Sequence, residues 1–213
     1  MNQITFDRVL PDVFVNQDIS SEVWNCQFNL QRGQNYLIEA ASGTGKSSLC
    51  SYVFGFRKDF RGVISFDGAN IRGLKIADWV NLRKRSLGLL WQDLRLFGEL
   101  TARENVDLKN RLTHFQKKAQ IDQWFERLGI ADKQAAKVAQ MSFGQQQRVA
   151  LIRVLCQPLD FLFLDEPVSH LDEQNNRAMA ELIAEETARQ GAAVVVTSIG
   201  KRLEMDYHHI LKL

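Results

Sequence analysis

Cysteine is scarce in this chain of 213 residues, which contains only Cys26, Cys50 and Cys156. The three thiols are odd in number and far apart, and no pair has the spacing of a metal site or a redox motif. This scarcity argues against a disulfide-stapled fold and against a cysteine-based zinc site. We expect the three side chains to be buried free thiols in a reducing compartment.

Long hydrophobic runs are also missing. No stretch approaches the ~18 consecutive apolar residues that a membrane-spanning helix requires. The first ten residues include Asp7 and Arg8 and have no apolar core, which argues against a secretory signal peptide. We therefore expect a cytoplasmic protein that does not insert into a membrane, although it can dock on a membrane protein.

An excess of charge of one sign is absent as well. The formal net charge is +2, and the chain is 24% charged and 45% hydrophobic, as in ordinary globular proteins. We interpret the basic clusters at 57–58 and 83–85 as solvated faces, because a nucleic-acid interface needs a longer basic stripe with aromatic residues. The length suits a single domain, or one core with an inserted lobe.

Segments that favour strands alternate with segments that favour helices. Apolar runs predict strands at residues 36–40, 63–66, 87–91, 161–164, 192–197 and 209–213. Helices are predicted at 46–56 and at 173–190, where Gly191 is the expected stop. The run at 161–164 is apolar throughout, as in a strand buried on both faces. This alternation predicts a parallel sheet covered by helices.

Residues 93–158 differ from the rest of the chain, because they contain helical patterns and no convincing strand. One face of a helix is indicated by the spacing of Ile121, Trp124, Phe125 and Leu128. We interpret this stretch as a helical lobe inserted into the α/β core.

A glycine-rich segment lies between the first predicted strand and the helix at 46–56. Its glycines allow backbone N–H groups to turn towards phosphate oxygens, and a helix N-terminus favours an anion. Lys46 would reach the β- and γ-phosphates of a nucleotide, and the Ser47 hydroxyl would ligate Mg²⁺. Ala40 stands where the usual pattern begins with glycine. We predict a phosphate loop whose nucleotide-binding residues are Ser42, Gly43, Thr44, Gly45, Lys46, Ser47 and Ser48.

Two carboxylates, Asp165 and Glu166, follow the predicted strand at 161–164, where α/β sheets place ligand sites. In phosphate-loop ATPases such an aspartate holds Mg²⁺. Taken alone, the pair could equally be an acidic helix cap. The phosphate loop upstream makes a metal site the preferred interpretation.

A third motif lies in the sequence between the phosphate loop and the carboxylate pair. The segment Met141-Ser142-Phe143-Gly144-Gln145 opens a helical pattern and precedes the carboxylate pair. The three motifs in this order resemble the ATP-binding cassette (ABC) ATPases, whose signature Leu-Ser-Gly-Gly-Gln differs at Met141 and Phe143. The stretch 100–106, Leu-Thr-Ala-Arg-Glu-Asn-Val, is also common in that family. The resemblance covers nearly the whole chain and looks closest to the cassettes of lipoprotein release, macrolide export and cell division.

The resemblance implies an architecture. We expect an α/β fold with a P-loop (RecA-like) core and a parallel sheet, an antiparallel N-terminal β subdomain and an inserted α-helical subdomain. A single ABC ATPase domain would comprise residues 1–213, with the core and the N-terminal subdomain at 1–92 and 159–213 and the helical subdomain at 93–158.

The resemblance also implies roles for individual residues. Asp165 would hold Mg²⁺ together with Ser47 and Gln92, and Glu166 would polarise the attacking water with Gln92 beside it. Phe14 is the expected adenine-stacking aromatic, the alternative being a core phenylalanine. The loop at 169–172 would cross the interface of a homodimer. The ATP of the partner subunit would be contacted by Ser142, Phe143, Gly144 and Gln145.

The implied cofactors are therefore ATP and Mg²⁺. The implied partners are a second copy of the chain and a transmembrane permease whose cytoplasmic helix docks near Gln92 and the helical lobe. Such a subunit lies at the inner face of the cytoplasmic membrane and binds no nucleic acid. The transported substrate, which belongs to the permease, is not encoded in this chain.

One departure from the family concerns catalysis. The family has threonine–histidine after the valine-rich strand, and that histidine contacts the γ-phosphate, whereas this chain has Thr197 and Ser198. We place Ser198 at the catalytic position and expect slow hydrolysis. His170, in the interface loop, is the alternative substitute.

Three other functions remain open at this point. An ATP-gated binding or signalling module would bind ATP and a membrane partner with little turnover. A phosphate-loop kinase would need an acceptor site and has no use for a signature facing a second nucleotide. A soluble ABC factor acting on ribosomes or DNA usually carries two cassettes or a long insert, which this chain lacks.

Overall fold

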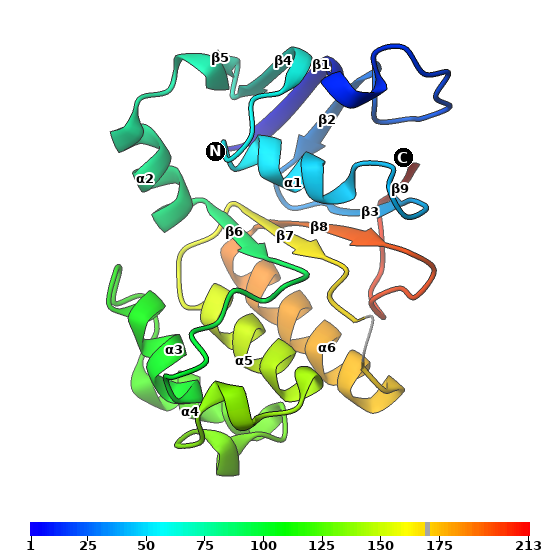
Figure 1. Ribbon diagram of the computed structural model, residues 1–213. Coiled ribbons are helices and arrows are strands. Elements are labelled where there is room, and N and C mark those ends of the chain that lie inside the picture. Colours follow the sequence, from blue (N-terminus) through cyan, green and yellow to red (C-terminus); the bar gives the residue numbers. More distant parts are fainter. Residues whose placement is uncertain (169–170) are drawn as a thin grey trace.

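The computed structural model describes residues 1–168 and 171–213. The chain forms two sheets with helix α1 (Lys46–Val53) between them (Figure 1). The upper sheet is antiparallel and has the order β2-β1-β4-β5. Its strands are β1 (Gln3–Pro11), β2 (Gln27–Gln31), β4 (Phe60–Phe66) and β5 (Ala69–Asn70). The predicted strand at 63–66 thus begins three residues earlier and belongs to this sheet.

The second sheet is parallel throughout and has the order β6-β7-β8-β3-β9. All five strands were predicted, and no end differs by more than one residue. They are β3 (Asn35–Glu39), β6 (Leu87–Leu90), β7 (Phe161–Asp165), β8 (Ala193–Ser198) and β9 (His209–Lys212).

Strand β7 explains why its sequence shows no polar face. Phe161 and Phe163 belong to the core between the two sheets, whereas Leu162 and Leu164 belong to the core on the opposite side. Successive side chains of a strand point to opposite faces, so a strand covered on both sides is apolar at every position. The prediction of a doubly buried strand is confirmed.

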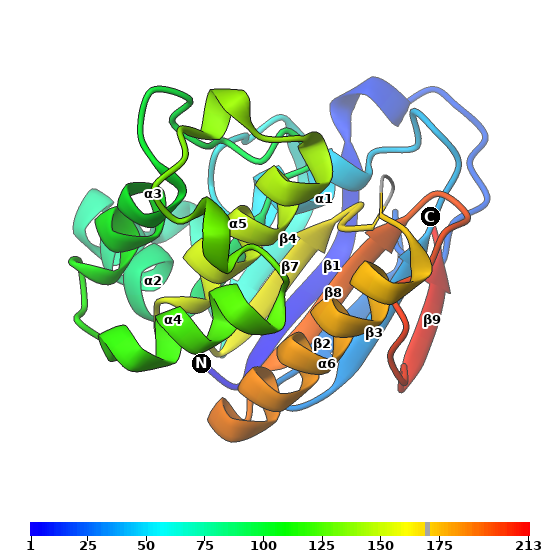
Figure 2. The same ribbon diagram turned by 90° about the horizontal axis from the view of Figure 1, so that it is seen from below.

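Helices α5 (Phe143–Leu155) and α6 (Glu173–Gln190) cover the lower face of the parallel sheet (Figure 1). Figure 2 shows α3 (Ala102–Asn110) and α4 (Lys118–Arg127) gathered beside α5, away from β9. Helix α2 (Ile76–Arg85) packs near β6. Within residues 93–158, all of which the structure describes, β structure is limited to the bridge between Thr101 and Lys137.

The helix ends agree with local signals. Helix α6 has the predicted bounds, and Gly191 ends it with a left-handed φ of 60°. Helix α1 is shorter than the predicted 46–56. It ends at Val53, and Gly55 shortly after it takes a left-handed φ of 66° that an α-helix does not contain.

The fold class is confirmed, with its parallel sheet, antiparallel sheet and inserted helices. The subdomain boundaries near residues 93 and 158 stay a prediction.

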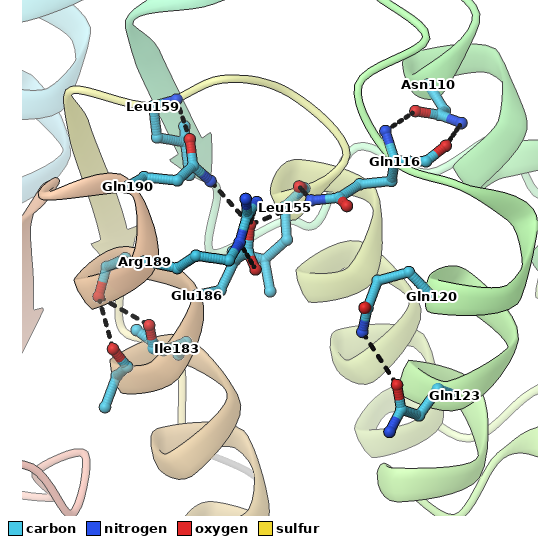
Figure 3. Close-up of polar contacts among 12 residues, drawn as sticks. Asn110, Gln116, Gln120, Gln123, Leu155, Leu159, Ile183, Glu186, Arg189 and Gln190 are labelled. Carbon is cyan, nitrogen blue, oxygen red and sulfur yellow. Dashed lines mark hydrogen bonds and ion pairs between the residues drawn. The ribbon is translucent and has the colours of Figure 1, made fainter.

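A buried carboxylate joins the helical lobe to the core (Figure 3). Glu186 of α6 is 6% exposed and accepts hydrogen bonds from Gln116 at 3.0 Å and Gln190 at 2.9 Å. Gln190 in turn accepts a hydrogen bond from the Leu159 backbone N–H at 2.7 Å, just before β7. The network therefore connects the segment before α4 with α6 and the parallel sheet.

The structure revises two expectations about exposure, for Cys26 and for Arg83. Cys50 and Cys156 are buried free thiols as expected, but Cys26 is only half-buried. Arg83 is not on a solvated face, because its guanidinium lies 4.4 Å from the ring centroid of Phe56 and 5.3 Å from that of Trp79. None of the helices in the described part of the chain combines the length and the apolarity needed to cross a membrane.

Candidate functional site

The phosphate loop joins the carboxyl end of β3 to the N-terminus of α1. Gly43 and Gly45 take left-handed φ values of 84° and 99°, a conformation that glycine adopts without a steric penalty. Ala40 is not among the residues with positive φ, and its backbone N–H donates to the Ser198 carbonyl at 3.1 Å. The alanine that replaces the first glycine is therefore not strained.

Lys46 and Ser47 of this loop face the end of strand β7. The Lys46 side chain is 5% exposed, and its Nζ lies 2.8 Å from the Ala41 carbonyl and 3.7 Å from Glu166 Oε1. Ser47 Oγ donates to Asp165 Oδ2 at 2.8 Å. A buried cation and a hydroxyl–carboxylate pair thus lie at the N-terminus of α1, where an anion is favoured.

Asp165 is held on its other side by a residue that our sequence analysis did not assign a role. Thr197 of β8 pairs with Asp165 in the sheet register and donates a hydrogen bond to Oδ1 at 2.6 Å. Both side chains are buried. The two carboxylate oxygens are consequently fixed by two hydroxyl donors, one from the phosphate loop and one from the neighbouring strand.

Glu166 and Gln92 meet beside this pair. Gln92 Nε2 donates to Glu166 Oε2 at 3.3 Å, so the second residue after β6 contacts the first residue after β7. Glu166 has a left-handed φ of 51°, and such backbone outliers in non-glycine residues cluster at functional sites. The structure therefore brings together five of the predicted site residues: Lys46, Ser47, Gln92, Asp165 and Glu166.

The oxygen donors fit a Mg²⁺ ion. In octahedral coordination with bonds of about 2.0–2.1 Å, neighbouring ligands lie roughly 3 Å apart. The distance of 2.8 Å between Ser47 Oγ and Asp165 Oδ2 agrees with this spacing. Among the described residues no group of three or more His, Cys, Asp or Glu could hold a metal alone, so nucleotide phosphates and water would complete such a site.

An aromatic pocket of about 310 Å³ adjoins the phosphate loop. Phe14 and Trp24 line it together with Ser42, Gly43 and Thr44. Trp24 Nε1 donates to the Thr44 carbonyl at 2.9 Å, and a Cβ built on Gly45 would lie 3.1 Å from the Trp24 ring and 3.3 Å from the Phe14 ring. Trp24 was missed from the sequence, because no local pattern in its irregular surroundings signals a contact with the loop.

The Ser48 side chain has a different hydrogen-bond partner from that of its neighbour Ser47. Its hydroxyl accepts a hydrogen bond from Arg57 at 2.9 Å.

Cys50 of α1, three residues after Ser47, has its thiol pKa raised well above the usual value, first by burial and then by the Asp165 carboxylate. This thiol is therefore protonated and unreactive beside the site.

The signature segment opens α5. Ser142 is the N-cap of this helix and accepts from the Gln145 N–H at 3.3 Å, while the Gln145 side chain accepts from the Ser142 N–H at 3.0 Å. Phe143 and Gly144 form the first turn, and the Phe143 side chain is 39% exposed. Gln147, also missed from the sequence, donates to the Pro167 carbonyl at 3.3 Å and so connects this helix with the segment after Glu166.

The Ser198 side chain is hydrogen-bonded within the loop that follows β8. It is 2% exposed, and its Oγ donates to the Lys201 carbonyl at 2.5 Å. The Lys201 ammonium donates to the Leu171 carbonyl. The only proton of the Ser198 hydroxyl is engaged within this loop, which does not favour a direct role as a donor to phosphate. His170 and the first half of the predicted interface loop lie outside the described residues.

Comparison with known proteins identifies relatives of this chain. A sequence model of the ABC transporter family matches residues 23–169. The methionine import ATP-binding protein MetN 2 of Paraburkholderia xenovorans is 33% identical over 81% of this chain and 45% of its own length. The macrolide export ATP-binding/permease protein MacB of Vibrio parahaemolyticus is 32% identical over 81% of this chain and 27% of its own length. This chain thus spans less than half of either relative.

A solved structure supports the same assignment. The dimeric structure of MJ0796, a bacterial ABC transporter cassette, superimposes with a TM-score of 0.76 and 25% identity over 92% of this chain and 87% of that chain. The family match extends from before the phosphate loop to beyond the carboxylate pair, and it includes the signature segment. This chain therefore belongs to the ABC transporter family, as an ATP-binding domain of the ABC ATPase type.

Proposed function

We propose that this chain binds and hydrolyses MgATP at an interface between two copies and that the resulting closing and opening drive a membrane permease. The observation that carries this proposal is the convergence of the phosphate loop, Gln92 and the Asp165–Glu166 pair at the carboxyl ends of β3, β6 and β7. Ligands of parallel α/β sheets bind at that edge.

Each residue has a role that its geometry supports. Lys46 would leave the Ala41 carbonyl and pair with the β- and γ-phosphates, as phosphate-loop lysines do. Ser47 and Asp165 would hold Mg²⁺, which offsets phosphate charge, with Gln92 as a further oxygen donor. Glu166 would accept a proton from the attacking water and is kept in place by Gln92. Phe14, with Trp24 beside it, would stack on the adenine.

A second copy would complete the site. In one chain the side chains of Ser142 and Gln145 each accept a hydrogen bond from the other residue's backbone N–H, so that the first turn of α5 presents a capped helix N-terminus. Such an end favours an anion, and the γ-phosphate held by the partner subunit is the proposed anion. The dimeric form of the cassette MJ0796 supports this arrangement.

The permease would dock beside Gln92, where the helical lobe meets the core. The relative MacB is by name an ATP-binding/permease protein, which supports a permease partner, and the chain would then lie at the inner face of the membrane. The relatives include import and export proteins, and the proposed cycle of closing and opening suits either direction of transport.

The alternative is an ATP-gated module that binds and dimerises with little turnover. It is favoured by Ser198, whose hydroxyl proton is engaged by Lys201. Steady-state ATPase rates measured with the permease present distinguish the two, because a module would show binding without turnover.

Trapping of the dimer tests the main proposal. Glu166→Gln should bind MgATP but slow the attack of water, so that an ATP-dependent dimer accumulates in size-exclusion chromatography. Ser142→Arg added to this variant should prevent the dimer by placing a long side chain at the shared interface, while ATP binding persists. Only monomers for Glu166→Gln at high protein concentration would contradict the facing dimer, and an intact dimer in the double variant would show that the signature does not face the partner's nucleotide.

A further inference from the structure

The indole of Trp24 lies against the phosphate loop from outside it. Trp24 is 3% exposed and belongs to the turn that precedes β2. Its Nε1–H donates to the Thr44 carbonyl at 2.9 Å, and its ring lies 3.1 Å from the position of a Cβ built on Gly45. One side chain therefore contacts the residues on both sides of the peptide bond between Thr44 and Gly45.

That peptide unit has two orientations open to it. Turning a planar peptide unit over by about 180° changes mainly the ψ of the residue before it and the φ of the residue after it. Glycine adopts positive and negative φ about equally well, and Gly45 has a φ of 99°. The glycine that allows the loop to turn thus leaves the direction of its own N–H unspecified by local sterics.

The indole selects one of the two orientations. In a trans peptide unit the C=O and the N–H point in nearly opposite directions. Because the Thr44 carbonyl points to the indole, the Gly45 N–H points away from it. This N–H donates to no residue that the structure describes. Held in this direction just before α1, it can donate to a phosphate oxygen.

Trp24 is itself held by contacts outside the phosphate loop. Its backbone N–H donates to Ser21 Oγ at 2.9 Å, and the next residue, Asn25, donates to the Val9 carbonyl of β1 at 2.8 Å. Its ring meets the buried ring of Tyr52 in α1 edge to face, with centroids 6.3 Å apart. The indole donor is thus fixed relative to the antiparallel sheet and to α1, so that its position does not depend on the loop.

We propose that Trp24 is a positioning residue of the nucleotide site, whose indole N–H holds the peptide between Thr44 and Gly45 in the orientation that offers the Gly45 N–H to a phosphate. The inference rests on the proposed function for the class of ligand, a nucleoside triphosphate, whereas the orientation of the peptide follows from the contacts of Trp24. A site that is competent for part of the time binds more weakly in proportion to that fraction. Loss of the indole donor therefore weakens the binding of phosphates and leaves the binding of the base unchanged.

An isosteric replacement tests this role, because it removes the N–H and keeps the shape of the ring. The amino acid β-(3-benzothienyl)alanine carries sulfur in place of the indole N–H and is incorporated at position 24. The same replacement at Trp124, a buried residue of α4 in the helical lobe, is the control. Calorimetric titration in the presence of Mg²⁺ measures the affinities for ATP and for inorganic triphosphate.

We expect the analogue at position 24 to weaken the binding of both probes by the same factor, about three- to tenfold, which is the effect of one ordinary hydrogen bond. The ratio of the two affinities reports the contribution of the nucleoside and should stay unchanged. The control should bind both probes as the unaltered chain does. Unchanged affinity for triphosphate would overturn the proposal. A loss confined to ATP would also overturn it, because Trp24 would then act only on the base.

The backbone of Gly45 gives a second readout, which a merely structural aromatic residue would not change. The three-bond coupling between the amide and α protons depends on φ and is measured by nuclear magnetic resonance. In the ligand-free analogue this coupling should move away from its value in the unaltered chain, as the peptide samples both orientations, and saturating MgATP should restore it. An identical coupling in the two ligand-free proteins would contradict the positioning role.

The two proposals fail in different ways. If Glu166→Gln forms its MgATP-dependent dimer while the analogue at position 24 binds triphosphate normally, the role of Trp24 is wrong and the ATPase assignment stands. If the Glu166→Gln dimer fails while the analogue changes the Gly45 coupling and weakens both probes, Trp24 positions the loop of a protein that is not an ATP-driven dimer. The coupling of the ligand-free proteins needs no nucleotide, so it tests the indole contact by itself.

Discussion

At the scale of single residues, the carboxylate that we propose to hold Mg²⁺ is hydrogen-bonded by a threonine that is remote in sequence. Thr197 donates to Asp165 at 2.6 Å, and both side chains are almost fully buried. A carboxylate held by two donors keeps one orientation, which pre-organises it for a cation.

Thr197→Val keeps the shape of the side chain and removes its hydroxyl. We expect the free energy of unfolding to fall by about 1–3 kcal/mol, because Asp165 Oδ1 loses a buried partner. The Mg²⁺ concentration for half-maximal ATPase activity should rise. Thr197→Ser, which keeps the donor, serves as the control in urea titrations and rate measurements. Equal Mg²⁺ dependence of the valine variant and the unaltered chain would contradict the positioning role.

Ser198 leads to a prediction about rate. An imidazole at this position could reach the γ-phosphate, and one well-placed transition-state donor is worth on the order of 10²–10³ in rate. We expect slow basal hydrolysis that Ser198→His accelerates, measured as kcat with and without the permease. Ser198→Ala should change kcat little, because the Ser198 hydroxyl is occupied by the Lys201 carbonyl. A fast unaltered enzyme that Ser198→His leaves unchanged or slows would show that another residue already fills this role.

At the scale of elements, a few polar contacts across α6 add direction to the apolar core that the helical lobe shares with the parallel sheet. Gln116, in the segment between α3 and α4, reaches Glu186 at 3.0 Å, and Gln190 connects the same carboxylate to the start of β7 (Figure 3). These hydrogen bonds are directional, so they specify how the lobe sits on the core as well as adding to stability.

Glu186→Ala removes the shared acceptor of this network. We expect a loss of about 1–3 kcal/mol in the free energy of unfolding, because the Gln116 and Gln190 amides lose a buried partner. The neighbouring Glu185 pairs with Arg127 at the surface and is 64% exposed, so Glu185→Ala should cost only about 0–1 kcal/mol. Similar chemical denaturation curves for the two variants would show that the network adds no stability.

At the scale of the whole molecule, ligand binding should raise the free energy of unfolding of the chain. MgATP at about 100 times its Kd would stabilise the folded chain by ~2.7 kcal/mol. Lys46→Ala should lose most of this gain, because the phosphate charge is then unpaired in a buried site. Differential scanning calorimetry with and without MgATP measures the shift, with the exposed Lys118→Ala as control. A full shift in the folded Lys46→Ala protein would refute the phosphate-loop assignment.

Much of the site could be predicted because its parts are contiguous. Glycines at 43 and 45 adopt positive φ for local steric reasons, and the N-cap at Ser142 satisfies helix N–H groups within one turn. The apolar run at 161–164 likewise reflects burial on both faces. The sequence by itself therefore determined the motifs, the strands and helices that carry them, and the order in which they occur.

Only the tertiary structure decided which of these parts touch. Strand β8 lies between β7 and β3, and this brings Thr197 to Asp165, although nothing near either residue indicates the pairing. Trp24 against the phosphate loop and Arg83 between Phe56 and Trp79 are similar cases. Local patterns record conformational preference and burial, whereas these contacts arise from packing between distant segments.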